Sequence, residues 1–161
     1  MTITTSTIIY DIMGALQTLN ATIGGCAAPQ PALYPTVIDT MNGQPFVMTW
    51  PGAGESWQKG AGYSQGKRTY RVICFLDPVA QSDIPSHAID GMSILRKLKN
   101  VYILSSNTPL INPGAFQATI ESGPDGPHIT DSGLIPTLSF GGRAWFGFEI
   151  PVPIRWQGAQ L

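Results

Sequence analysis

Hydrophobic and polar residues alternate most regularly between Arg143 and Trp156. Every even position in this stretch is apolar, whereas the odd positions carry arginine, glutamate, glycine and proline as well as Trp145. The even positions are Ala144, Phe146, Phe148, Ile150, Val152, Ile154 and Trp156. Because successive side chains of a β-strand point to opposite faces, this period of two predicts a long strand with one buried and one polar face.

Pro151 and Pro153 constrain how this strand pairs. Proline has no backbone N–H, and the N–H groups of alternate residues point to the same edge of a strand. Both prolines therefore lack a donor on one edge, which cannot form a regular ladder there. The sequence predicts that the distal half of the strand lies at a sheet edge, where Pro151 and Pro153 block further pairing.

Two segments have the period of a helix. The first can be capped by Ser6 or Thr7 and can end at Gly24-Gly25. Its apolar stripe consists of Ile8, Ile9, Ile12, Met13, Leu16, Leu19 and Ile23. The second begins at residues 83–85. Its predicted apolar side consists of Ile89, Met92, Leu95, Leu98 and Tyr102.

Four further strands are predicted, at residues 45–50, 67–76, 115–122 and 134–140. The segment 51–66 is expected to form a long glycine-rich loop. The resulting order is α-β-β-α-β-β-β, which predicts an α+β fold with a mainly antiparallel sheet packed against two helices. The chain has 161 residues, so residues 1–161 are predicted to form a single domain.

Charges are sparse along the chain. Charged residues make up 12%, against about 25% in an average protein, and the net charge is −1. A weakly charged surface is typical of a protein partly covered by partners. The charge provides no basic field for tight binding of nucleic acid. Residues 1–16 have no basic start and no long apolar run. We therefore expect that the protein does not span a membrane and that it assembles in a cytoplasm-like compartment.

Groups suited to catalysis or metal binding are few. Asp125, His128 and Asp131 are three residues apart and have the chemistry to bind a metal or transfer protons. The glycine, proline and serine around them favour a turn instead. Cys74 lies in an apolar strand and is expected to be a buried, reduced thiol. We therefore expect no enzymatic activity, no cofactor and no metal.

Aromatic and basic residues are the better candidates for contacts. Trp57, Lys59 and Tyr63 lie in the glycine-rich segment, where an interface role and local packing are equally reasonable interpretations. Four arginines lie on or beside predicted strands, where they would pair with acids of a neighbouring subunit, face passing DNA or be solvated. These are Arg68, Arg71, Arg143 and Arg155.

Several strings together resemble the tail terminator (tail completion) proteins of lambda-like long-tailed bacteriophages. They are IIYDIMGAL (residues 8–16), PFVMTWPG (45–52), RTYRVICFLDPVAQ (68–81), a DSG turn (131–133) and GGRAWFGFEIPVPIRW (141–156), with a central helix that has a basic end. The resemblance covers most of the chain. It implies a ring, usually a hexamer, that caps the head-proximal end of the tail tube, stops tube polymerisation and offers a surface to the head connector. It also implies no enzymatic activity and no cofactor.

The implied partners are other copies of the chain, the tail tube protein, the head–tail connector proteins, and double-stranded DNA that passes through the lumen without specific binding. The protein would belong to the tail or neck of the virion and assemble in the host cytoplasm. Two alternatives remain open. One is another phage neck component, such as a head-closure or adaptor protein. The other is a small enzyme or metal-binding domain that uses Asp125, His128 and Asp131.

Overall fold

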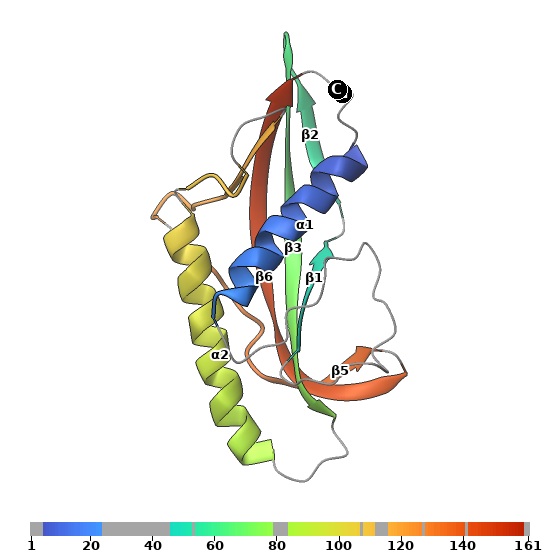
Figure 1. The fold of residues 1–161 in the computed structure, drawn as a ribbon, viewed down its shortest axis with the longest axis vertical. Helices are drawn as coiled ribbons and strands as arrows, with labels where there is room; N and C mark the ends of the chain where they lie inside the picture. Colours follow the sequence, from blue (N-terminus) through green and yellow to red (C-terminus); the bar gives the residue numbers. More distant parts are fainter. Residues whose placement is uncertain are drawn as a thin grey trace.

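The computed structural model describes residues 5–23, 46–52, 54–78, 84–106, 108–111, 116–126, 128–140 and 142–159. The elements are α1 (Thr5–Ala21), β1 (Phe46–Pro51), β2 (Ser56–Lys59), β3 (Tyr63–Pro78), α2 (Ile84–Ser105), β4 (Phe116–Ile120), β5 (Ile135–Phe140) and β6 (Arg143–Ala159). The strands form one antiparallel sheet against which both helices pack (Figure 1). The predicted α+β fold class is confirmed, and the element order matches approximately.

Two long strands, β3 and β6, form the centre of the sheet. They pair antiparallel from Tyr63 opposite Ala159 to Pro78 opposite Trp145. The far side of β3 is occupied by β1 and β2, and the far side of β6 by β4 and β5. Residues far apart in the sequence therefore become neighbours across this central pair.

The helix-facing side of the sheet carries the main core. The even residues of β6 from Phe148 to Trp156 are all buried, as the alternation predicts. Helix α1 crosses this side of the sheet (Figure 1) and buries four residues of its predicted stripe. They are Ile8, Ile12, Met13 and Leu16. The predicted end of this helix, Gly24-Gly25, lies outside the described residues.

Helix α2 packs with a stripe that differs from the predicted one. The predicted burial of Ile89 and Met92 is wrong, because their side chains are 73% and 37% exposed. Gly91 faces the sheet instead, and a Cβ at this position would lie 2.4 Å from Cδ1 of Leu76. The close approach at Gly91 turns Ile89 and Met92 outward. The rest of the buried stripe consists of Ile94, Leu95, Leu98 and Tyr102.

A buried polar network joins both helices to β1. Asn20 donates to Oε1 of Gln17 at 2.9 Å and to Oγ1 of Thr49 at 3.2 Å, and Thr49 donates to the same Gln17 oxygen at 2.8 Å. The hydroxyl of Tyr102 on α2 donates to Oδ1 of Asn20. Since buried polar groups cost free energy unless they are paired, this network favours one placement of the helices on the sheet.

The glycine-rich segment is not a loop throughout. Ser56–Lys59 forms β2, which pairs with residues 64–67, so β3 begins four residues earlier than predicted, at Tyr63. Gly62 has a φ of 80°, a conformation that glycine adopts without strain, and Gly60 N–H donates to the carbonyl of Tyr63 at 2.9 Å. The glycines that suggested a long loop thus include those of a tight hairpin turn.

Pro151 and Pro153 lie on a strand inside the sheet and not on an outermost strand. Among the described residues, however, no strand pairs with them on the side of β6 from which their N–H groups are missing, as the prolines predict. Strand β3 pairs with β6 along its whole length, including both prolines. On the other side, β5 pairs with residues 143–147 and β4 with residues 154–158. Within the described part of the chain, residues 148–153 have no strand partner on that second side.

The prolines lie where the ladder between β4 and β6 ends. Glu121 N–H donates to the carbonyl of Pro153 at 2.8 Å, so Pro153 directs its backbone toward β4. The reciprocal bond cannot form, because proline has no N–H. Further along, Ser132 N–H donates to the carbonyl of Glu149 at 2.9 Å, and Glu149 N–H donates to Oγ of Ser132 at 2.9 Å. The prolines therefore interrupt pairing inside the sheet, and their predicted role in assembly stays a prediction.

At one end the sheet curls (Figure 1), and residues on its other face are buried there. Gly147 permits close packing here, because a Cβ would lie 2.0 Å from the carbonyl oxygen of Cys74. Trp145, expected on the polar face, is only 2% exposed and packs edge-on against Phe75, with ring centroids 5.7 Å apart. Met48 completes this small cluster. Cys74 itself is buried and does not form a disulfide, as predicted.

Candidate interaction surfaces

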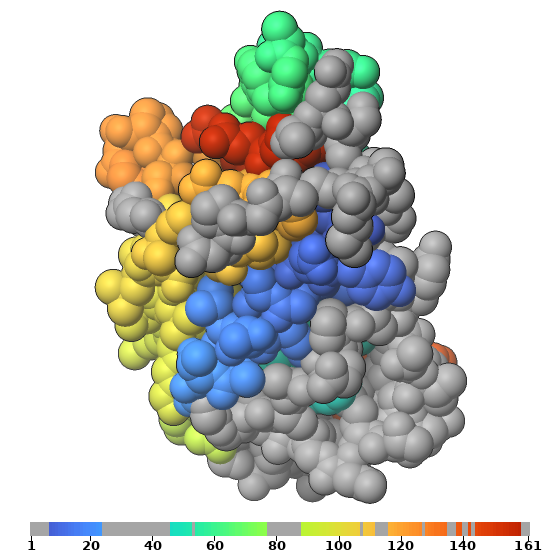
Figure 2. Space-filling model, turned by 45° about the horizontal axis from the view of Figure 1, so that its top comes forward, coloured from blue at the N-terminus to red at the C-terminus, as the bar shows by residue number. Residues whose placement is uncertain are grey.

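The β2–β3 hairpin carries three of the predicted contact residues. Trp57 and Tyr63 are 54% and 45% exposed, and Lys59 is also exposed. The hairpin forms a green projection at one end of the molecule in Figure 2. Trp57 lies opposite Gly66 in register, three residues from Tyr63 along the same strand, so the two aromatic side chains lie on opposite faces of the hairpin. An approaching protein would meet an aromatic ring on either face.

Arg68 makes internal contacts. Its guanidinium donates to the carbonyl of Gly52 at 2.9 Å and lies 3.5 Å from the carboxylate of Glu55, and the side chain is only 16% exposed. Glu55 also accepts a hydrogen bond from the indole of Trp156 at 2.9 Å. Arg68 thus anchors the segment before β2 to the core, and any role in subunit contacts stays a prediction.

The sheet face opposite the helices, here called the distal face, carries crossing ion pairs. Arg71 donates to Glu149 through Nε and Nη2, both at 2.5 Å, and this bonding raises the pKa of the guanidinium. Lys67 on β3 pairs with Glu121, which follows β4, so this pair spans β6. These contacts bring together residues that the sequence separates by more than fifty positions.

Arg155 is a cation of the distal face without an acidic partner among the residues that the structure describes. It lies directly opposite Lys67 on one side and Thr119 on the other. Odd residues of β6 direct their backbone groups toward β4, as the carbonyl of Pro153 does, and therefore away from β3. Arg155 and Lys67 on β3 thus form a pair without backbone hydrogen bonds between them. Side chains are closest in such pairs, and like charges there repel. The structure brings two positive groups together with a single acid, Glu121.

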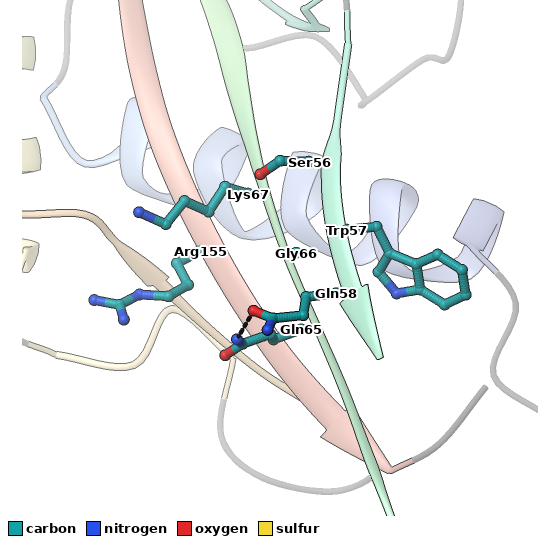
Figure 3. Close-up of a pocket in the computed structure, with 7 residues that line it drawn as sticks. All are labelled: Ser56, Trp57, Gln58, Gln65, Gly66, Lys67 and Arg155. Atoms are coloured by element: carbon teal, nitrogen blue, oxygen red, sulfur yellow. Dashed lines mark hydrogen bonds between the residues drawn. The ribbon is translucent and has the colours of Figure 1, made fainter. Parts of the chain in front are cut away.

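A shallow cavity of about 200 Å³ adjoins Arg155 and Lys67. In Figure 3, Lys67 and Arg155 point to the same side, whereas Trp57 points away from them. Gln65 donates to Gln58 at 2.8 Å on the cavity wall. The lining residues are Ser56, Trp57, Gln58, Gln65, Gly66, Lys67 and Arg155. The side chain of Arg143, the remaining predicted contact residue, lies outside the described part.

The outward side of α2 is an apolar surface that the sequence analysis missed. Ile89 and Leu104 are 73% and 71% exposed, and Met92 lies between them. Arg96 and Lys97 lie in the middle of this surface and have no acidic partner in the described ranges. The available sequence signal was Gly91, since a glycine on a helix marks a possible close approach and thereby the inward side.

The turn that contains Asp125, His128 and Asp131 is held by Lys99. The Asp131 carboxylate accepts from Nζ of Lys99 at 2.5 Å and from Gly133 N–H at 2.8 Å, and the bond from Lys99 lowers the pKa of Asp131. The side chains of Asp125 and His128 are exposed. Over the described residues, no group of three histidine, cysteine, aspartate or glutamate side chains has the arrangement to hold a metal ion.

Neither helix, over its described residues, combines the length and apolar character needed to cross a membrane. A scan against protein-family models found no match, and a search of curated proteins found none either.

Proposed function

We propose that this protein is a structural virion protein of a long-tailed phage that assembles into a ring, a hexamer by its resemblance, at the head-proximal end of the tail tube. There the ring stops tube polymerisation and provides the surface for head–tail joining. The resemblance of the sequence and the α+β fold support this proposal. The observation that carries it is the presence of two separate exposed apolar surfaces.

A ring of identical subunits needs two different, complementary surfaces on each copy, because a head-to-tail contact uses one surface of one copy and another surface of the next. The β2–β3 hairpin, with Trp57 and Tyr63, is one candidate surface. The outward side of α2, with Ile89 and Met92, is the other. In Figure 1 the hairpin lies at the top and the first turns of α2 at the bottom, so the two surfaces are well separated.

The charges on α2 favour a head-to-tail contact over a two-fold one. In a two-fold pairing of α2 with its own copy, Arg96 and Lys97 would meet the same residues of the second helix, because they lie midway between Ile89 and Leu104. Such like-charge contacts are unfavourable. Addition of subunits to the ring ends when the ring has closed. One side of the ring then contacts the tail tube, whereas the other side does not offer the surface to which further tube subunits would bind.

The first test is the size of the purified protein, measured by analytical ultracentrifugation and negative-stain microscopy. Rings are expected for the native chain. Trp57→Ser with Tyr63→Ser, and separately Ile89→Ser with Met92→Ser, should yield monomers with unchanged circular dichroism. An aromatic contact in an interface is worth about 2 kcal/mol, or roughly 30-fold in dissociation constant. Rings that survive both double substitutions would refute the assigned contact surfaces.

Tyr10→Ser is a matched control, since Tyr10 on α1 and Tyr63 are both 45% exposed. It should leave the rings intact. The second test adds the protein to polymerising tail tube protein and measures tube length. Capped, shorter tubes support the terminator role. Tubes of unchanged length, together with binding to head connector proteins, would favour the alternative of a head-closure or adaptor protein.

A further inference from the structure

We propose that the cavity beside Lys67 and Arg155 binds the carboxylate of an acidic side chain on a partner protein. The cavity shares residues 56–58 with the hairpin, but Trp57 points away from Lys67 and Arg155 (Figure 3), so the site lies on the other side of the hairpin from the indole assigned to the ring contact. The site depends on a juxtaposition that strand pairing creates: two cations lie directly opposite each other on adjacent strands, and the described residues supply one acid, Glu121, for the two.

The donors around the cavity suit an oxyanion. The guanidinium of Arg155 has five N–H groups in a fork that matches a carboxylate, and none has an acceptor among the described residues. Lys67 uses one N–H for Glu121 and has two more. Ser56 adds a hydroxyl, and Gln58, whose amide oxygen accepts from Gln65, adds the two N–H groups of its amide nitrogen. A bound carboxylate would also relieve the repulsion between the two cations.

The backbone of this site is held in place before any ligand arrives. Lys67 and Arg155 lie on the central strands β3 and β6, and Ser56 and Gln58 lie on β2, which pairs with β3. Arg155 is flanked on its other side by Thr119 of β4. Because strand pairing fixes the backbone, binding orders only the side chains, which favours affinity.

A single carboxylate fits this face better than a polyanion. Three cations and two glutamates share the described distal face, which leaves one net positive charge; Glu121 pairs with Lys67, and Glu149 lies six residues from Arg155 along β6. Duplex DNA carries one negative charge per roughly 1.7 Å of its axis, so it would bring phosphates against Glu121 and Glu149. A single acidic side chain that reaches Arg155 and Lys67 meets only Glu121, whose charge Lys67 already pairs, and stays clear of Glu149.

Nuclear magnetic resonance of the arginine Nε–H signals of the full chain tests the site. The probe is an N-acetylated, C-amidated triglutamate peptide, and the matching triglutamine peptide is its control. Triglutamate should shift the Arg155 signal in a saturable way, and triglutamine should not. Arg155→Gln assigns the signal by its loss, and the affinity of this variant for triglutamate, followed on the backbone amide signals of β2, should be about tenfold weaker or more. Lys67→Gln should weaken it too, because it also leaves the carboxylate of Glu121 unpaired beside the ligand.

Arg96→Gln is the control variant, because Arg96 is exposed on α2 and also lacks an acidic partner among the described residues. It should leave the affinity for triglutamate unchanged. If Arg96→Gln weakens the binding of triglutamate as much as Arg155→Gln does, the proposal is overturned. The same holds if the Arg155 signal does not respond to triglutamate or responds equally to triglutamine. Tighter binding of a short duplex DNA than of triglutamate at physiological salt, lost in Arg155→Gln, would replace the protein partner with nucleic acid.

Discussion

Replacement of Tyr102 by phenylalanine tests how the helices are held on the sheet. Tyr102 is fully buried, and its hydroxyl donates to Oδ1 of Asn20. Burial raises the pKa of Tyr102, so its hydroxyl remains a donor throughout the neutral range. The amide nitrogen of Asn20 already donates to Gln17 and Thr49. Within the described chain no second donor reaches Oδ1, so Tyr102→Phe leaves a buried oxygen unpaired.

The expected loss of stability follows from that unpaired oxygen. A buried acceptor without a partner costs about 1–3 kcal/mol, whereas replacement of both partners would cost less. We expect Tyr102→Phe to lower the free energy of unfolding by about 2 kcal/mol, from a total of about 5–15 kcal/mol for a natural domain. For a chain of this length, such a loss lowers Tm by about 4–8 °C.

Urea unfolding followed by circular dichroism measures this loss. The urea concentration at the midpoint of unfolding should fall. The dependence of the unfolding free energy on urea concentration should stay the same, because the substitution removes one hydrogen bond and leaves the buried area nearly the same. Tyr10→Phe is the control, since Tyr10 is 45% exposed and its substitution should change stability by less than about 0.5 kcal/mol. If Tyr102→Phe costs no more than Tyr10→Phe, the buried bond to Asn20 does not contribute as argued.

Three further substitutions test other features. Gly147→Ala should destabilise the protein by about 3 kcal/mol or more in thermal melts, because the new Cβ would lie 2.0 Å from a backbone oxygen on β3. Asp131→Asn should cost up to about 1 kcal/mol at neutral pH. The bond from Lys99 lowers the pKa of Asp131, so this stabilisation is complete above the ordinary carboxyl pKa of 3.8 and is lost as the pH falls through the lower folded value; the two proteins should converge in acid. Pro151→Val with Pro153→Val restores two N–H donors between β4 and β5 and should promote over-assembly in light scattering, whereas unchanged ring size and solubility would count against an assembly role.

Local periodicity predicted the elements that bury one clear face. The alternation along β6 correctly placed Phe148, Ile150, Val152 and Ile154 in the core, and the helical stripe of α1 was confirmed. Both patterns repeat over several turns or residue pairs, so a single exception changes little. In α2 the apolar residues extend around more than one side, and the close approach at Gly91 decided which side is buried. That contact involves Leu76 on another element, which helical periodicity does not reveal.

The candidate interaction surfaces depend on strand register, which the sequence alone does not specify. Lys67 and Arg155 are neighbours because β3 and β6 pair in one particular register, and a shift by one residue would place one of them on the other face. The sequence predicted Arg155 as one of four candidate contact arginines and did not include Lys67 among the candidates. The pairing supplies Lys67 as the neighbour of Arg155 and the cavity beside both.

The interrupted stretch of β6 and the charges of the distal face belong to one arrangement. Pro151 and Pro153 remove two backbone donors from the second side of β6, which weakens the sheet there. Arg71 lies opposite Pro151, and its bond to Glu149 joins β3 to β6 beside that position. The pair formed by Lys67 and Glu121 spans β6 next to Pro153. Only the pair of Lys67 with Glu121 reaches the side on which backbone bonding is missing, and together the two ion pairs engage every described cation of this face except Arg155. The acids of this face are thus taken by Lys67 and Arg71, and Arg155 is left as the positive group available to a partner.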